Sequence, residues 1–312
     1  MFSYAAQIRQ ELSVRNAAYA KARGLTHVCS FGEQSVIVYP PHSSDERHGN
    51  FIEASYAAIL AQNEWRRRLE KPHPQARSLP KAERPWKELD SCMSSDALLM
   101  NVFCHPRVFS AAGVRSLLGI ENGDTPVFGF PARVPLRGGR KDQTEVDMKL
   151  GALLLESKLT EPDFQTQAAE IVERYSDLDE VFERSALPRM GEQYCSYQLI
   201  RNVLAAHALK LSFCALLDNR RPDLRDACYS IMRCIKSSDL RTRCKILTWQ
   251  ELSGVLRPDL QKFLDLKYGI ALLGSVPMTT DQVNSFPSAP VNRLTRSSRP
   301  EFMRRAIHVT SS

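Results

Sequence analysis

The sequence predicts a mixed α/β fold in which a small central sheet is flanked by helices. The first observation is a set of short apolar runs typical of buried strands, at residues 152–155, 211–217 and 244–249. The second is that segments with helical periodicity stand before, between and after these runs. The order from residue 94 onward is helix, strands, a strand that ends in charges, helices, strand, helix, strand.

The N-terminal part is predicted to be mostly helical. Residues 3–24 are rich in Ala, Gln, Arg and Glu, and Gly24 is expected to end this helix. Residues 27–39 suit a short hairpin, and residues 51–70 read as one amphipathic helix ending in three arginines. Four prolines mark residues 71–86 as a connector.

The central part carries the expected sheet. Ser94 or Ser95 can cap the helix that follows, and residues 113–134 are turn-rich with short strand candidates. Strands are then expected on both sides of Gly151, which is the natural turn between them. Further helices are predicted at residues 162–175, 192–208, 223–235, 250–256 and 259–268.

The C-terminal part from residue 275 onward is rich in Pro, Ser, Thr and Arg and has no apolar periodicity. The predicted organisation is therefore a helical N-terminal extension packed on the core (1–89), one domain with the sheet (90–272), and a disordered basic tail (273–312).

Composition narrows the class of protein. The net charge is +7 and the sequence pI is about 9.0, which permits a polyanionic partner without proving one. The eight cysteines include no C-x-x-C pair, which favours a reduced, cytoplasmic protein over a disulfide framework. Because no secretory signal and no apolar run of about 18 residues is present, a membrane protein is not expected.

The most informative stretch is residues 145–162. Its apolar run continues into Glu156 and Lys158, which share one face of a strand because strand side chains alternate. A buried carboxylate and ammonium cost several kcal/mol each unless they are compensated. Antiparallel pairing across Gly151 would bring Asp147 towards Glu156, so two carboxylates and a lysine would meet at one place. Carboxylate oxygens with water form the usual site for Mg²⁺.

Asp147 on one strand and Glu156-Ser157-Lys158 on the next, within this order of elements, resemble the PD-(D/E)xK nuclease superfamily, which has the restriction-endonuclease-like fold. Segments 94–101, 197–202 and 246–252 are similar to a poorly characterised bacterial branch of it. The resemblance implies that Asp147 and Glu156 hold Mg²⁺, with Mn²⁺ as a substitute, and that Lys158 orients or activates the attacking water. One departure is Val146, where the pattern that gives the superfamily its name has proline.

Further residues are candidates for supporting roles. Glu145 shares a strand face with Asp147, and either it is a third acidic group or it only shapes the site. Gln198 and Arg201 are three residues apart on one helix face, where they could bind phosphate or form an ordinary polar stripe. Asp96 and Glu121 are alternatives for a further carboxylate.

A basic glycine turn follows residue 136. Arg137, Arg140 and Lys141 flank Gly138-Gly139 and could contact a nucleic-acid backbone, although such a turn can also be purely structural.

The function expected from these observations is Mg²⁺-dependent hydrolysis of DNA phosphodiester bonds, with endonuclease action and with RNA as a second substrate option. A homodimer would suit cleavage of both strands of a duplex. The alternatives are a catalytically silent nucleic-acid-binding protein of the same fold, or an interaction protein whose charge is incidental.

Overall fold

The computed structural model describes residues 3–30, 36–40, 47–73, 81, 83 and 85–271, so the predicted tail lies outside the described residues. At the centre is a five-stranded sheet with the order β10-β9-β5-β4-β3. Its strands β5, β9 and β10 run parallel, whereas β3-β4-β5 form an antiparallel meander. The bounds are Val127–Pro131 (β3), Glu145–Leu150 (β4), Leu153–Ser157 (β5), Ser212–Leu217 (β9) and Cys244–Thr248 (β10).

Strand β5 lies in the middle of this sheet, and every one of its residues is buried. Leu155 pairs with Met148 of β4 on one side and with Cys214 of β9 on the other. A strand with neighbours on both sides and helices on both faces needs a continuous apolar sequence, which explains the run of leucines.

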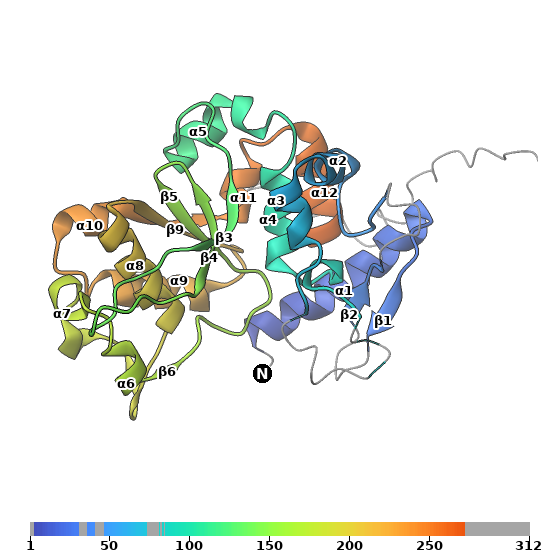
Figure 1. Ribbon diagram of the computed structural model, residues 1–312. Helices are drawn as coiled ribbons and strands as arrows, with labels where there is room; N and C mark the ends of the chain where they lie inside the picture. The colour runs from blue at the N-terminus through green and yellow to red at the C-terminus, as the bar shows by residue number, and fades with distance from the viewer. Residues whose placement is uncertain are drawn as a thin grey trace, which may run out of the picture.

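Helices α1 (Tyr4–Arg23), α4 (Ser95–Phe103), α5 (Ala112–Leu118), α11 (Trp249–Ser253) and α12 (Pro258–Tyr268) cover one face. Their apolar side chains form one cluster with residues from the strands, among them Met148, Leu153 and Leu155. Figure 1 shows α1, α4 and α12 together on one side of the sheet.

The other face is covered by α7 (Leu178–Val181), α8 (Tyr197–Leu209), α9 (Pro222–Met232) and α10 (Ser238–Arg243). A second cluster joins Leu199 and Val203 of α8 to Leu154, Phe213 and Ala215 of the sheet. The fold is thus a three-layer α/β/α arrangement, and the predicted fold class is confirmed (Figure 1).

The N-terminal helices pack onto this framework. Helices α2 (Glu53–Ala61) and α3 (Asn63–Arg68) bury Tyr56, Ile59 and Trp65 against Met100 of α4. In α1, Arg15 donates to the carbonyl oxygen of Asp265 at 3.1 Å, and the Asn16 amide donates to that of Lys267 at 3.1 Å. The division into an extension and a core domain stays a prediction.

The remaining elements are short. Two small sheets are formed by β1 (Val28–Ser30) with β2 (Val36–Val38), and by β6 (Gln167–Ala168), β8 (Gln193–Tyr194) and β7 (Arg189–Met190). Helix α6 spans Ala169–Val172, and single 3₁₀ turns lie at Glu88–Asp90, Val108–Ser110 and Arg184–Ala186.

Several predicted elements differ from the structure. Helix α5 stands where turns and short strands were expected, and helix α10 was not predicted. The helix expected at 51–70 is interrupted at Gln62, whose backbone is extended, so it forms α2 and α3. The helix expected at 162–175 is wrong, because residues 167–168 pair with 193–194 and only α6 remains helical. The same pairing delays the start of α8 to Tyr197, five residues later than predicted.

The eight cysteines are free thiols, as the sequence predicts. Within the part of the chain that the structure describes, no helix has both the length and the apolar character needed to cross a membrane.

Candidate active site

The candidate site lies where the β4–β5 hairpin opens away from its turn. Gly151 has a φ of 53° at the turn, and a Cβ there would clash with the Asp124 carboxylate, so glycine is required. The ladder runs from Leu150↔Leu153 to Met148↔Leu155. The next pair in this register is Asp147 and Glu156.

Asp147 lies beside the strand that carries Glu156. Its Oδ2 accepts a hydrogen bond of 2.8 Å from the backbone N–H of Ser157. Beyond the last ladder pair this N–H has no backbone partner on β4, and the Asp147 carboxylate takes that place. The contact fixes the carboxyl group of β4 next to the acidic end of β5.

Glu156 is 1% exposed and is held from two sides. Its Oε1 accepts from Nζ of Lys158 at 2.8 Å, and its Oε2 accepts from Nδ2 of Asn202 at 2.8 Å. Lys158 is 4% exposed, with Nζ 5.6 Å from the ring centroid of Phe164. The buried carboxylate and ammonium compensate each other, which meets the requirement for burying charge.

The charges of this cluster shift two pKa values. Burial raises the pKa of Asp147 well above its usual value, and the nearby Glu156 and Asp96 carboxylates raise it further against the opposing effect of Lys158. Burial alone would lower the pKa of Lys158, but the attraction of Glu156, together with Glu161 and Asp147, raises it above the usual lysine value. Lys158 is therefore an ammonium at neutral pH, while Asp147 holds its proton to a higher pH than an exposed aspartate.

Two arginines hydrogen-bond to the backbone of the loop that follows Lys158. Arg9 of α1 donates to the carbonyl oxygen of Thr160 at 3.0 Å. Arg221, which is 1% exposed, donates to the carbonyl oxygens of Glu161 at 2.8 Å and Pro162 at 2.9 Å. These contacts fix the backbone directly after the candidate lysine.

A second charged group adjoins Asp147. Asp96, in the first turn of α4, accepts from Arg68 at 2.9 Å and from Lys71 at 3.0 Å. Arg68 also bonds the exposed Glu145 carboxylate at 3.0 Å, so one guanidinium bridges α4 and β4.

Of the two alternative carboxylates, Asp96 lies close enough to affect Asp147, whereas Glu121 is exposed in the loop before β3.

The two residues predicted on one helix face, Gln198 and Arg201, differ in their hydrogen bonding. Oε1 of Gln198 is buried and has no hydrogen-bond partner among the described residues. Arg201 is 4% exposed, and its guanidinium donates to Oδ1 of Asn202 and to the carbonyl oxygen of Glu145. Arg201 thus orients the amide that binds Glu156, while Gln198 offers an unused acceptor.

The basic glycine turn is exposed. Its backbone closes through a 2.8 Å bond from the Leu136 N–H to the Arg140 carbonyl, and Arg137 forms an ion pair of 3.0 Å with Asp179. Arg140 and Lys141 are exposed. No hydrogen bond or ion pair links the three basic side chains to Asp147 or Glu156 within the described residues.

The oxygen donors of this site bear on whether it can hold a metal ion. No group of three or more His, Cys, Asp or Glu residues suited to a metal occurs in the described part of the chain. Asp147 and Glu156 nevertheless offer hard oxygen donors. Burial first, and then the neighbouring Glu156 and Asp96 carboxylates, raise the pKa of Asp147, so a cation beside it would favour its charged form. Two carboxylates fit Mg²⁺, which usually keeps several waters and takes one or two protein carboxylates.

Asn202, Arg68 and Lys71 belong to the site but were not predicted from the sequence. Asn202 lies four residues after Gln198, a spacing that places both on one helix face. The prediction took Arg201, three residues after Gln198, but the side chain that bonds Glu156 is Asn202. Arg68 had no comparable signal, because its partners Asp96 and Glu145 are 28 and 77 residues away.

Comparison with known families gives one result. The model of a family described as restriction endonuclease associating with ARP matches residues 13–269, which is most of the chain and includes the whole candidate site. No curated protein and no solved structure matches the chain.

Proposed function

The chain belongs to the family described as restriction endonuclease associating with ARP, and from this premise we propose that it is a metal-dependent nuclease that hydrolyses DNA phosphodiester bonds at Asp147, Glu156 and Lys158. Membership confirms the resemblance to restriction-endonuclease-like proteins and assigns the chain to a nuclease family.

One observation carries the proposal. Asp147 and Glu156 come from adjacent strands, where Oδ2 of Asp147 accepts from the Ser157 N–H at 2.8 Å and Lys158 bonds Glu156 at 2.8 Å. Burial, and after it the nearby Glu156 carboxylate, raises the pKa of Asp147. Like charges close together in a buried place are costly unless a cation compensates them. Such an arrangement is typical of functional sites.

Asp147 and Glu156 are the residues proposed to hold Mg²⁺, with Mn²⁺ as a substitute. When bound, the ion would supply an acidified water and stabilise negative charge on the phosphoryl oxygens. Asp147 must lose its proton before it can serve as a ligand, because a protonated carboxyl binds cations poorly. Asn202 keeps Glu156 in one orientation, with Oε2 at the end of a 2.8 Å hydrogen bond.

Lys158 is proposed to orient the attacking water and to donate to a phosphate oxygen. Its raised pKa keeps the side chain protonated at neutral pH, which favours donating a hydrogen bond over accepting a proton. The Phe164 ring and the Glu156 carboxylate restrict the ammonium to one position. Gln198 is proposed as a supporting acceptor for water or for a substrate hydroxyl, and Arg201 and Glu145 as residues that shape the site.

DNA is the proposed substrate because of the family and the net charge of +7. Arg137, Arg140 and Lys141 are proposed to contact the backbone of the duplex from their exposed turn. Two copies of the chain would be needed to cut both strands at once, which makes the homodimer part of the same proposal.

Incubation of plasmid DNA with the full chain tests the proposal. Cleavage is expected with Mg²⁺ or Mn²⁺ and should stop when EDTA removes the metal. A structured RNA in a parallel reaction decides between DNA and RNA. No cleavage of either nucleic acid with either metal would refute the nuclease assignment.

A second candidate is a nucleic-acid-binding protein that keeps the fold without catalysis. The observation in its favour is that both carboxylate oxygens of Glu156 already accept hydrogen bonds, from Lys158 and Asn202. Binding of DNA that is independent of metal and never leads to cleavage would favour this candidate.

A further inference from the structure

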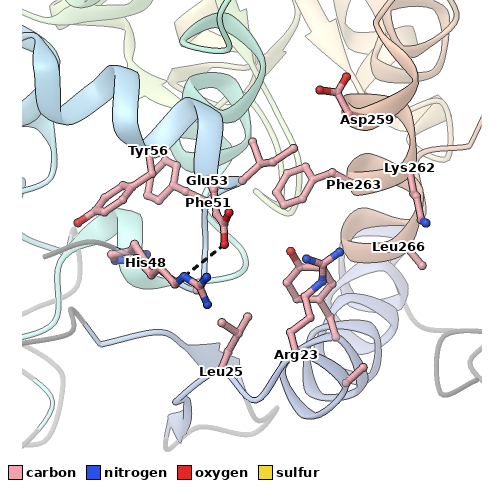
Figure 2. A pocket seen from close by; sticks show the side chains of 15 residues that line it. Arg23, Leu25, His48, Phe51, Glu53, Tyr56, Asp259, Lys262, Phe263 and Leu266 are labelled. Carbon is pink, nitrogen blue, oxygen red and sulfur yellow. Dashed lines mark ion pairs between the residues drawn. The ribbon is translucent and has the colours of Figure 1, made fainter. Parts of the chain in front are cut away.

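A cavity of about 590 Å³ lies away from the candidate active site, between α1, residues 47–56 and α12. Asp147, Glu156 and Lys158 do not line it. Figure 2 shows the side chains of these three segments around a common space, with Phe51 and Phe263 on different sides of it. Its volume lies within the range usual for sites that bind small molecules.

The apolar part of the cavity wall contains two pairs of aromatic rings. Phe51 stacks on Tyr56 with ring centroids 5.7 Å apart, and Tyr19 meets Phe263 edge to face at 6.2 Å. Leu25, Ile52 and Leu266 add aliphatic surface to the lining. Aromatic rings held in fixed pairs offer faces and edges to a flat ring, which gains more from them than from aliphatic contact alone.

The acidic side chains of the lining already have cationic neighbours. Glu53 forms an ion pair of 3.3 Å with Arg47, another lining residue. Asp259 lies 3.5 Å from Arg257 and 3.3 Å from His105. Neither carboxylate is therefore available to recognise a cationic ligand without losing an existing contact.

Arg23 is different. It is exposed at the end of α1, its guanidinium lies 4.8 Å from the centroid of the Tyr19 ring, and no carboxylate within the described residues forms an ion pair with it. In Figure 2 its side chain lies beside the cavity, opposite Phe51 and Glu53. The guanidinium offers planar donors of the kind that bind carboxylate, sulfonate or phosphate.

We propose that this cavity binds a small aromatic anion, with the ring between the apolar walls and the acidic group at Arg23. The proposal concerns a second site and does not depend on the nuclease activity. An apolar body and an anionic group are both required, because the lining supplies ring contacts and, in Arg23, an arginine that forms no ion pair with a carboxylate of the described residues; Lys262 also lines the cavity and adds positive charge.

Naphthalene-2-carboxylate is a suitable probe. Titrated into the full chain in a calorimeter, it is expected to bind one-to-one with a dissociation constant on the order of 10⁻⁵ to 10⁻⁴ M, as a ligand of this size allows. The matched cation, 2-naphthylmethylammonium, should bind at least about tenfold more weakly. Laurate tests whether the body must be aromatic, and tighter binding of laurate than of the naphthoate would overturn the aromatic assignment.

Two substitutions on α1 locate the site. Arg23→Ala should weaken naphthoate binding by about tenfold or more, and Arg23→Lys should restore part of the loss. Ala22→Trp places a large ring in the cavity and should abolish binding. Arg67→Ala removes an exposed arginine of α3 that does not line the cavity, and it should leave the affinity unchanged.

Circular dichroism and thermal melting of each variant control for folding. Because Arg23 is exposed, its substitution keeps the test valid even where Ala22→Trp fails to fold. The proposal is overturned when the naphthoate does not bind the wild-type chain at millimolar concentration. It is also overturned when Arg23→Ala and folded Ala22→Trp bind as tightly as the wild type.

Discussion

Nδ2 of Asn202 donates a hydrogen bond of 2.8 Å to Oε2 of Glu156 and so connects α8 to the end of β5. The guanidinium of Arg201 donates to the oxygen of the same amide, Oδ1 of Asn202, and so fixes its orientation. The orientation of the buried carboxylate therefore depends on a helix that begins about 40 residues later in the chain.

Replacing Asn202 with alanine should loosen Glu156 without removing it. We expect Asn202→Ala to weaken Mg²⁺ binding and to slow cleavage by about 10- to 100-fold, the range typical for partners that orient a metal ligand. Calorimetry and single-turnover cleavage measure the two effects. Asn63→Ala, on an exposed residue of α3, is the matched control, and an equal metal affinity for wild type and Asn202→Ala would contradict the proposed role.

Neutralising either carboxylate should abolish cleavage. Asp147→Asn and Glu156→Gln keep the size of the side chain but remove the charge needed to hold a cation. DNA binding should be retained or become tighter, because negative charge near the phosphate falls. Plasmid cleavage and a gel-shift assay with and without Mg²⁺ measure both, with Glu170→Gln on the exposed surface of α6 as the control. Cleavage at the wild-type rate by either variant would remove that residue from the site.

Lys158→Arg tests the chemistry more sharply than the carboxylate variants. It keeps the positive charge, but the planar guanidinium is larger than the ammonium and presents its donors in another geometry beside Phe164 and Glu156. We predict at least a ~100-fold loss of single-turnover cleavage at saturating Mg²⁺, the lower end of the loss expected when one donor that stabilises transition-state charge is misplaced. Metal and DNA affinity should stay close to the wild-type values. Near-normal cleavage would leave Lys158 as a structural partner of Glu156.

The raised pKa of Asp147 predicts that metal binding depends on pH. Burial and the neighbouring Glu156 and Asp96 keep the carboxyl protonated above its usual range, so a proton must leave when a cation binds. Mg²⁺ affinity should rise about tenfold per pH unit between the ordinary aspartate pKa and the raised one. Calorimetry in two buffers with different ionisation enthalpies measures the released proton, and an affinity that is constant over this window would contradict the prediction.

The same shift affects stability in the absence of metal. The folded chain keeps a proton on Asp147 at pH values where the unfolded chain has lost it. The contribution of Asp147 to the free energy of unfolding is therefore present at low pH and is lost as the pH rises through the raised pKa. The free energy of unfolding of Asp147→Asn should not show this loss. Denaturant titrations of both proteins at several pH values measure the difference.

Lys267 predicts a second pH dependence, of opposite sign. Burial lowers its pKa to about 7, and Arg23 acts in the same direction, while Cys92 opposes them. Its Nζ lies 4.0 Å from the ring centroid of Tyr39 and donates to the Gly49 carbonyl at 3.2 Å. In the unfolded chain the same amine stays protonated up to the ordinary lysine pKa of about 10.4. Between pH 7 and about 10.4 the unfolded state binds more protons than the folded state. The free energy of unfolding therefore rises with pH across this window, and the gain is lost as the pH falls back to 7.

Lys267→Met removes this group while keeping an apolar side chain of similar length. We expect the variant to gain most over the wild type near pH 6 and to lose that advantage towards pH 10, by up to about 1.4 kcal/mol per pH unit within the window. Urea titrations at pH 6, 8 and 10 measure the trend. A difference between the two proteins that does not change with pH would show that Lys267 titrates normally.

The elements that the sequence predicted best are those decided by neighbouring residues. The run of leucines before Glu156 is buried throughout, and the turn falls at Gly151 with its left-handed backbone, because both depend only on local pattern. Ser94 caps α4 by accepting from the Ala97 N–H, another contact three residues apart. The adjacency of Asp147 and Glu156 also follows from one tight hairpin.

What the sequence could not predict depends on docking between distant segments. Arg68 reaches Glu145 across 77 residues, and no periodicity in either segment indicates that α3 packs beside β4. The short strands at residues 167–168 and 193–194 form only because each meets the other, so both flanking helices were predicted too long. The cavity beside Arg23 needs three segments from both ends of the described chain, and none of them shows it alone.

The contact between α1 and α12 has a consequence for how the protein is made. The first helix buries Ile8 and Leu12 in a cluster with Leu260 and Leu264 of the last described helix, more than 240 residues downstream. On the ribosome, α1 emerges long before its partner exists, and at roughly 5–20 residues per second the wait lasts tens of seconds or less. During that time the apolar side of α1 is exposed to other nascent chains and to chaperones. Any fragment that stops before residue 258 leaves the same surface uncovered, so truncated translation products of this chain would be expected to aggregate or to be degraded.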